Sequence, residues 1–318
     1  MNLLKNNILP ICTLALLLSA CAKEQALSEQ VYAPLTLEMS YGDDTSTDQY
    51  YDFSTGKIRY IIRTFPVGAI YTKVKPVQEF TFYKDLNDGF DHSVTLDFLV
   101  GDYDVMVWSD LIQAGDDTPC HNAENFGEIS LLGAYAGNNE YRDAFRGAAS
   151  VKVSADAKEP AGLKVEMERP LARYELISSD FPEFVGTQTK LASGEFTLAD
   201  YTPVVFYVGY VPSVFSLYAD KPVDSATGVC FVSSLTELNE WEVSLGFDYV
   251  FVGESQSSVT VQVGIYDPYG ELVSMSSPTK VLLNRNECTI KSGSFLTSTS
   301  SDGVHIDKEL DGNFSVPF

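Results

Sequence analysis

Apolar and polar residues alternate along most of this chain, most clearly in its second half. From residue 241 to 251 every second residue is apolar: Trp241, Val243, Leu245, Phe247, Tyr249 and Phe251. A second alternating series, over residues 259–265, follows turn-forming residues at 253–258. A side-chain period of two is typical of β-strands with one buried face. The pattern predicts an antiparallel hairpin whose other face, including Asp248, meets solvent.

The first half of the chain shows the same alternation. Apolar residues alternate over residues 94–100 and again over 103–107. Short strands separated by Gly, Asp and Ser turns are typical of antiparallel β-sandwiches, so the sequence predicts an all-β fold. One stretch, residues 139–146, could form two helical turns, with Asn138 or Asn139 as the N-cap and Gly147 as the stop.

The length of 318 residues fits two domains of about 150 residues each. Arg169-Pro170 marks the expected boundary, because Pro170 can begin a strand but not lie inside one. We therefore expect four segments: a signal peptide (1–20), a lipidated tether (21–30), an N-terminal β-sandwich (31–168) and a C-terminal β-sandwich (169–318).

The N-terminal residues differ from the rest. Residues 8–18 form an apolar run that is too short to span a membrane and has the length of a signal-peptide core. Leu18-Ser19-Ala20-Cys21 follows directly and resembles the bacterial lipobox; the alternative is a plain secretory signal with a chance cysteine. The resemblance implies acyl chains on Cys21, and each buried CH₂ contributes about 0.8 kcal/mol to membrane binding. Because no Asp follows Cys21, we expect a lipid-anchored outer-membrane protein. Lys23-Glu24 partly resembles the surface-export signal of Bacteroidetes lipoproteins, which implies that the protein faces the cell exterior.

The chain is strongly acidic, with 21 Lys and Arg against 44 Asp and Glu and a formal net charge of −23. Such a field repels phosphate backbones, so nucleic acid is not an expected partner. The same charge keeps a protein soluble on a crowded surface.

Three cysteines remain once Cys12 leaves with the signal peptide and Cys21 carries lipid. They are Cys120, Cys230 and Cys288. A non-cytoplasmic compartment permits disulfides, and Cys230 and Cys288 lie in the same half and could pair. The other interpretation is that these thiols are free and buried.

Motifs for catalysis or cofactor binding are missing from the sequence. It has no nucleophile elbow, phosphate-binding loop, zinc-protease motif or Cys-x-x-Cys pair. The adjacent Cys120-His121 has no third ligand close by in the sequence, so a simple loop is favoured over a metal or nucleophile site. Acidic clusters around Asp44, Asp88 and Asp311 are interpreted as solvated turns rather than calcium sites. We predict no enzyme activity, no cofactor and no metal site.

The last residues form a strand-like segment in which Phe314, Val316 and Phe318 alternate with polar residues or proline. Aligned apolar side chains are unfavourable unless buried, at roughly 1.5–3 kcal/mol for each large one. One interpretation is a final strand in the second sandwich's own sheet. The other is a strand that leaves and pairs with a neighbouring subunit, since strand addition supplies backbone hydrogen bonds and side-chain pockets.

Four passages stand out by their order and spacing. They are Gly101-Asp102-Tyr103-Asp104-Val105-Met106-Val107-Trp108-Ser109-Asp110, Asn138-Asn139-Glu140-Tyr141-Arg142-Asp143-Ala144-Phe145, Arg169-Pro170-Leu171-Ala172-Arg173-Tyr174, and Leu283-Asn284-Arg285-Asn286 leading to Gly293-Ser294-Phe295-Leu296-Thr297. With the lipobox, they resemble the fimbrillin-like lipoproteins of Bacteroidales, which are related to minor-fimbria anchor and accessory proteins. The resemblance implies two tandem transthyretin-like β-sandwich domains, a role in fimbria assembly and no catalytic residues.

One departure from that family concerns proteolytic processing. Shaft-forming fimbrillins are usually cut after an Arg near the first strand. Here the first candidates, Arg59 and Arg63, lie in Ile58-Arg59-Tyr60-Ile61-Ile62-Arg63, which predicts a strand rather than an exposed linker. The resemblance therefore implies an anchor, tip or accessory subunit.

The predicted function is that of a surface lipoprotein acting as a fimbria-associated structural, anchor or adhesion subunit, with other fimbrial subunits as partners through β-strand addition. The alternative is a glycan-binding surface lipoprotein, because exposed aromatic side chains can form sugar-binding surfaces. Aromatic residues make up 12% of the chain, but most lie in the alternating pattern, where core packing explains them. The sequence names no small-molecule ligand.

Overall fold

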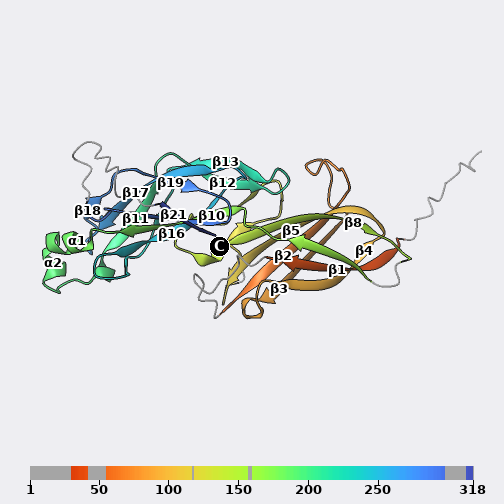
Figure 1. Cartoon of the computed structure of the whole chain (residues 1–318), viewed down its shortest axis with the longest axis horizontal. Coiled ribbons are helices and arrows are strands. Elements are labelled where there is room, and N and C mark those ends of the chain that lie inside the picture. The colour runs from red at the N-terminus through yellow and green to blue at the C-terminus, as the bar shows by residue number, and fades with distance from the viewer. Residues whose placement is uncertain (1–29, 42–54, 117, 157–159, 298–312, 318) are drawn as a thin grey trace, which may run out of the picture.

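The structure is a computed structural model that describes residues 30–41, 55–116, 118–156, 160–297 and 313–317. Its described strands form five sheets in which most strand pairs are antiparallel. The prediction of an all-β fold built from antiparallel sheets is confirmed. Figure 1 shows an elongated molecule, with the N-terminal half (residues up to 168) at one end and the C-terminal half (residues from 169) at the other.

Two sheets enclose the core of the N-terminal half. One has the strand order β4-β1-β9, and the other has the order β3-β2-β5-β8. Leu35, Ile62 and Val105 are among the fully buried side chains between them. The strands are β1 (Tyr32–Ser40), β2 (Gly56–Pro66), β3 (Gln78–Asp85), β4 (His92–Leu99), β5 (Gly101–Gln113), β8 (Ala144–Val153) and β9 (Ala161–Glu166).

Two further sheets enclose the core of the C-terminal half. One has the order β15-β16-β10-β20-β21; in the other, β14-β11-β17-β18, strand β19 also pairs with β17. Tyr174, Val205 and Val263 lie in the core between them. The strands are β10 (Leu171–Ser178), β11 (Thr202–Tyr207), β14 (Cys230–Val232), β15 (Thr236–Glu237), β16 (Val243–Phe251), β17 (Ser257–Tyr266), β18 (Leu272–Met275), β19 (Thr279–Leu283), β20 (Glu287–Gly293) and β21 (Asn313–Pro317).

The fifth sheet, β13-β12-β7-β6, combines strands from both halves. β7 of the N-terminal half pairs with β12 of the C-terminal half through Ser130↔Val214 and Ile129↔Phe215. The division into domains at residue 169 therefore stays a prediction. The strands of this sheet are β6 (His121–Asn122), β7 (Ile129–Leu131), β12 (Tyr210–Ser216) and β13 (Lys221–Thr227).

The sheet β3-β2-β5-β8 is also covered on its outer face. Ile61, Phe65 and Trp108 point away from the N-terminal core into a third apolar cluster, which includes Phe215 and Phe251 of the C-terminal half. A sheet buried on both faces requires strands that are apolar on both sides. This explains the nearly unbroken burial along β2 and β5. The two halves therefore share a core at their joint.

A buried polar network crosses the same joint. Arg142, which precedes β8, forms an ion pair with Asp248 of β16, and both side chains are almost completely buried. The hydroxyls of Tyr135 and Tyr207 donate to Asp248 Oδ2 at 2.6 and 2.5 Å. Burial raises the pKa of Asp248, while Arg142 and the two hydroxyls lower it. These contacts fix the segment around residues 135–142 against the C-terminal half.

The hairpin predicted between residues 241–251 and 259–265 is wrong. β16 pairs with β10 and β15, whereas β17 pairs with β11, β18 and β19. The connection between β16 and β17 thus crosses from one sheet to the opposite sheet. Alternation shows which face of a strand is buried, but it does not show which strand lies next to it.

The predicted solvated face of residues 241–251 is also wrong. The register of β16 with β10 shifts at a bulge, and Gly246 there has a φ of 101°. Leu245, before the bulge, packs in the C-terminal core, whereas Phe251, after it, packs in the third cluster. The extra residue in a bulge changes the face to which later side chains point, so Asp248 is buried.

Helical structure differs from the prediction. Residues 139–146 form only a 3₁₀ turn, η4 (Glu140–Arg142), capped by the Asn139 side chain, which accepts from Tyr141 N at 3.0 Å. β8 begins at Ala144, because Asp143 already has an extended backbone. The helices that follow β10 were not predicted. The other described helices are η3 (Leu86–Asp88), α1 (Phe181–Thr187), α2 (Thr189–Ala192) and η5 (Leu198–Asp200).

Removing Arg142 is expected to destabilise the protein strongly, because the buried Asp248 carboxylate loses its cation. Arg142→Met should lower the free energy of unfolding by about 3–5 kcal/mol, measured by chemical denaturation. Lys164→Met, which breaks the exposed Lys164–Glu166 ion pair, is the matched control and should change it by no more than about 1 kcal/mol. Equal effects of the two substitutions would contradict the importance of the buried pair.

Candidate functional site

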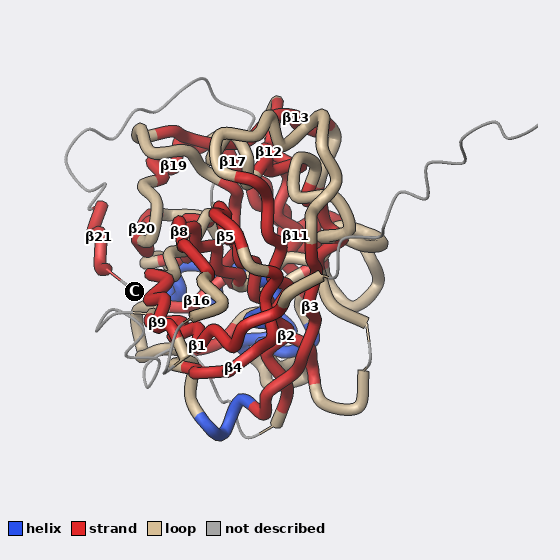
Figure 2. Tube along the Cα trace, turned by 90° about the vertical axis from the view of Figure 1, so that its right-hand side faces the viewer, coloured by secondary structure: helices blue, strands red, loops and turns tan. Residues whose placement is uncertain are grey.

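The segment predicted to exchange between subunits forms β21, the outermost strand of its sheet. It pairs antiparallel with β20, from Glu287↔Pro317 to Lys291↔Asn313. Figure 2 shows β21 at the margin of the molecule, beside β20. In the described part of the chain, no strand pairs with its other edge. One neighbouring strand therefore supplies all of its sheet pairing.

The register places Phe314 opposite Ile290 and Val316 opposite Cys288. Phe318, the third predicted site residue, lies outside the described residues. Whether this strand is exchanged between subunits stays a prediction.

β20 is itself fixed in the shared core. It pairs with β10 on its other side, where Arg173 lies opposite Cys288. The Arg173 guanidinium lies 3.3 Å from carboxylates of Glu140 and of Glu175, and it donates to Cys288 Sγ at 3.5 Å. Burial raises the pKa of the Cys288 thiol, which keeps it protonated and unreactive. A strand held this firmly offers a preformed edge to β21 or to an equivalent strand.

The possible disulfide between Cys230 and Cys288 does not form, whereas the predicted lipid anchor is not tested by the described residues. Cys230 in β14 and Cys288 in β20 lie in different sheets and are both free, and Cys230 is exposed rather than buried. Cys21 and the tether up to residue 29 lie outside the described residues, so lipidation stays a prediction. In the part of the chain that the structure describes, no helix is long and apolar enough to cross a membrane.

The Cys120-His121 pair lies at the joint, and His121 begins β6. The imidazole is buried, and neither of its nitrogens has a hydrogen-bond partner. The nearest carboxylate, that of Asp110, lies 3.8 Å from Nδ1 and is already held by two hydrogen bonds from Arg59, at 2.8 and 2.6 Å. Burial lowers the pKa of His121 to about 3, so the ring is neutral. The ring packs edge-on against Trp108, as a core residue does.

The acidic clusters have separate outcomes. Asp88 lies in η3, whereas the clusters around Asp44 and Asp311 fall outside the described residues. Among the residues that the structure does describe, no group of three or more His, Cys, Asp or Glu could hold a metal ion.

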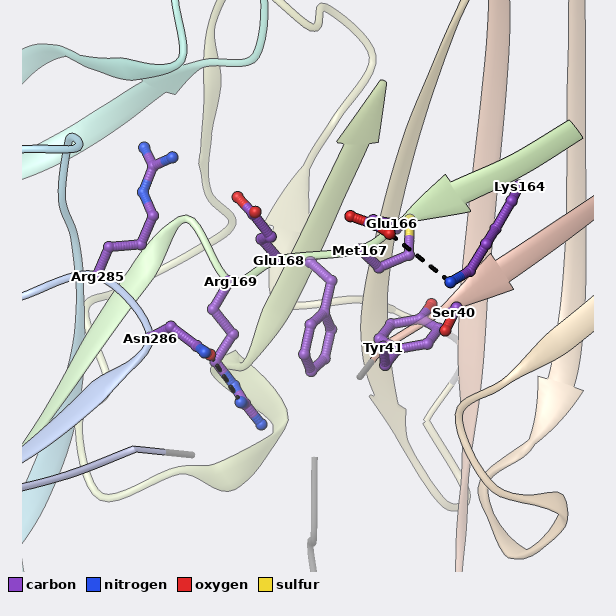
Figure 3. Close-up of a pocket in the computed structure, with 10 residues that line it drawn as sticks. Ser40, Tyr41, Lys164, Glu166, Met167, Glu168, Arg169, Arg285 and Asn286 are labelled. Carbon is purple, nitrogen blue, oxygen red and sulfur yellow. Dashed lines mark hydrogen bonds and ion pairs between the residues drawn. The ribbon is translucent and has the colours of Figure 1, made fainter. Parts of the chain in front are cut away.

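A cavity of about 480 Å³ opens at the joint between the halves. Figure 3 shows Lys164 and Glu166 on one side of it, Arg285 and Asn286 on the other, and Arg169 between them. Arg169 donates to a carboxylate oxygen of Asp143 at 2.8 Å and to Asn286 Oδ1 at 3.2 Å. The charged side chain of Arg169 in the cavity wall is therefore paired with groups of the protein itself, which is typical of a packing contact between the two halves.

The buried ion pairs at this joint were not predicted, although the four passages contain both members of the Arg169–Asp143 pair and one member of the Arg142–Asp248 pair. Trp108 comes from the first of the four passages, Arg142 and Asp143 from the second, Arg169 from the third and Asn286 from the fourth. All five lie at the joint, in its apolar cluster, its ion pairs or its cavity wall. The passages that carry the family resemblance thus form the contact between the halves.

A comparison with protein families gives a match over most of the chain. A model described as "Family of unknown function (DUF6562)" matches residues 22–316. The chain belongs to this family. A comparison with curated proteins finds no match.

Solved structures similar to this DUF6562 member include the following three. A candidate adhesin of Bacteroides thetaiotaomicron has a TM-score of 0.47 at 8% identity, over 85% of this chain and 94% of that one. The fimbrial anchor protein Mfa2 of Porphyromonas gingivalis has a TM-score of 0.43 at 10% identity, over 89% of this chain and 96% of that one. A fimbrial assembly protein of Parabacteroides distasonis has a TM-score of 0.41 at 9% identity, over 86% of this chain and 94% of that one. Proteins of the kind that the sequence resemblance predicted are thus among the matches.

His121 is expected to make the stability of this DUF6562 protein depend on pH. Its pKa is about 3 in the folded protein and about 6.5 in an unfolded chain. Protons therefore bind the unfolded chain first, so the free energy of unfolding falls as pH drops below about 6.5. The loss between about pH 7.5 and about pH 5 should be about 2 kcal/mol.

Chemical denaturation at the two pH values measures this loss. His121→Phe should abolish it, whereas His92→Gln, at a half-buried histidine, should retain most of it. An unchanged loss in His121→Phe would show that other groups cause the pH dependence.

Proposed function

We propose that the chain is a lipid-anchored protein of the outer cell surface that acts as a fimbria-associated structural, anchor or adhesion subunit, without enzyme activity. The observation that carries the proposal is the position of β21, an edge strand near the end of the chain that pairs with β20 alone among the described strands. Strand addition at such an edge joins subunits through backbone hydrogen bonds. The partners would be other fimbrial subunits.

The surroundings of Arg59 and Arg63 support an anchor or accessory role over a shaft role. Both residues lie inside β2, which pairs with β3 on one side and β5 on the other. Arg59 also binds Asp110, and Arg63 binds Glu79 at 2.5 Å. A protease that cuts after Arg needs an accessible, extended chain, and a central strand does not provide one.

Lipid anchoring is expected to depend on Cys21. Cys21→Ala should move the protein from the membrane fraction to the soluble fraction, because the acyl chains that hold it to lipid are lost. Detergent partitioning of fractionated cells measures this. Cys230→Ala, which removes an exposed thiol elsewhere, is the matched control and should stay with the membrane. A Cys21→Ala protein that still partitions with detergent would rule out the anchor.

Strand exchange is expected to depend on residues 313–318. Deleting them should leave a folded protein that no longer co-purifies with its partner subunits, because a strand that serves a neighbouring subunit makes its backbone pairing there. Thermal melting and affinity isolation from the native envelope measure the two properties. Val223→Ser, on the exposed edge strand β13, is the control and should change neither. Loss of the fold would show a purely structural strand, and unchanged association would refute exchange.

A further inference from the structure

The turn between β15 and β16, residues 238–242, exposes two large apolar side chains. Trp241 is 59% exposed and Leu238 is 47% exposed, whereas the chain's other tryptophan, Trp108, is fully buried. The turn lies at the end of the molecule that carries α1 and α2, because Val243 pairs with Ser178 just before α1. Figure 1 shows α1 and α2 at one end of the long axis, so the turn lies toward that end.

The 238–242 turn is rigid and acidic. Asn239 Oδ1 accepts hydrogen bonds from the backbone N–H groups of Trp241 and Glu242, at 2.9 and 3.0 Å. Glu237, Glu240 and Glu242 surround the two apolar side chains, and no described Lys, Arg or His forms an ion pair with any of the three. A preformed turn loses little entropy on binding, and its charge favours a basic partner surface.

The loop between β2 and β3, residues 67–77, has the opposite character. Val67 and Ile70 are 57% and 60% exposed, and Val74 is exposed beside Lys73 and Lys75. The loop contains no Asp or Glu, although the chain carries a net charge of −23. Hydrogen bonds at both ends hold its shape, from Val67 N to Asp102 O at 3.3 Å and from Val77 N to Thr64 O at 2.8 Å.

We propose that the 238–242 turn of one copy binds the 67–77 loop of a second copy, head to tail. An acidic apolar projection meets a basic apolar loop, while most of the remaining surface of so acidic a chain would repel the turn. The loop packs at the joint, where the rings of Tyr71 and Tyr218 lie 5.5 Å apart, whereas the turn lies toward α1 and α2, so the contact joins two molecules. It leaves the loop of the first copy and the turn of the second copy free, which permits growth into a chain.

The contact is small, so we expect it to be weak and sensitive to salt. It uses neither Cys21 nor β21. It can therefore stand or fall separately from the proposed function.

Sedimentation velocity of the full chain, over a range of concentrations at low and high salt, tests the proposal. The parent protein should self-associate at low salt. Trp241→Ala should weaken self-association about tenfold or more, and so should Lys73→Glu/Lys75→Glu. Tyr210→Ala removes an aromatic side chain that is 74% exposed at the start of β12, and it should associate like the parent.

Mixing the variants identifies the geometry. Trp241→Ala keeps an intact loop, and Lys73→Glu/Lys75→Glu keeps an intact turn, so the mixture should form a dimer that does not grow. Glu237→Lys/Glu240→Lys should be monomeric alone but should assemble with Lys73→Glu/Lys75→Glu, because the charges are again opposite. A parent that stays monomeric at low salt would overturn the proposal, even if the turn then binds a different protein. A Trp241→Ala variant that associates like the parent would also overturn it.

Discussion

The carboxylate of Asp248 lies fully buried between the two halves of the molecule and is held by groups from both. Arg142 and Tyr135 reach it from the N-terminal half, and Tyr207 reaches it from the C-terminal half. A buried carboxylate without a cation and hydrogen bonds is costly, so the segment that carries Arg142 must keep its place. The third apolar cluster includes Tyr249 and Phe251 of β16, the strand that carries Asp248, and joins this strand to β2 and β5. The two halves are consequently held in one relative position.

This shared joint explains where the pattern of the sequence was informative. Alternation correctly predicted an all-β fold, because most strands have one face on a core and one toward solvent. It could not show that β2 and β5 are covered on both faces, since the covering residues, such as Phe215, lie far along the chain. The glycine at position 246 was the one local signal of the bulge that buries Asp248. The partner of Asp248, 106 residues away, leaves no trace in a local pattern.

The candidate sites were predictable to different degrees, for physical reasons. The strand at Phe314 and Val316 follows from period-two alternation alone, but a strand's own sequence does not name the strand beside it. Trp241 belongs to an alternating series, which predicted burial. The side chain of Asn239 instead closes a turn there, which ends the strand pairing at Val243 and leaves the indole exposed. Turn chemistry thus overrode hydrophobic periodicity at this position.

The strong negative charge limits how such a molecule can associate. Two copies repel each other over most of their surfaces, so a contact must either reverse the charge locally or depend on interactions that charge affects little. The loop with Lys73 and Lys75 fits the first case, and backbone pairing along β20 fits the second. Salt screens the first contact and also screens the general repulsion that opposes the second. Rising salt should therefore weaken an association made through the loop and favour one made through a strand, which separates the two modes without any substitution.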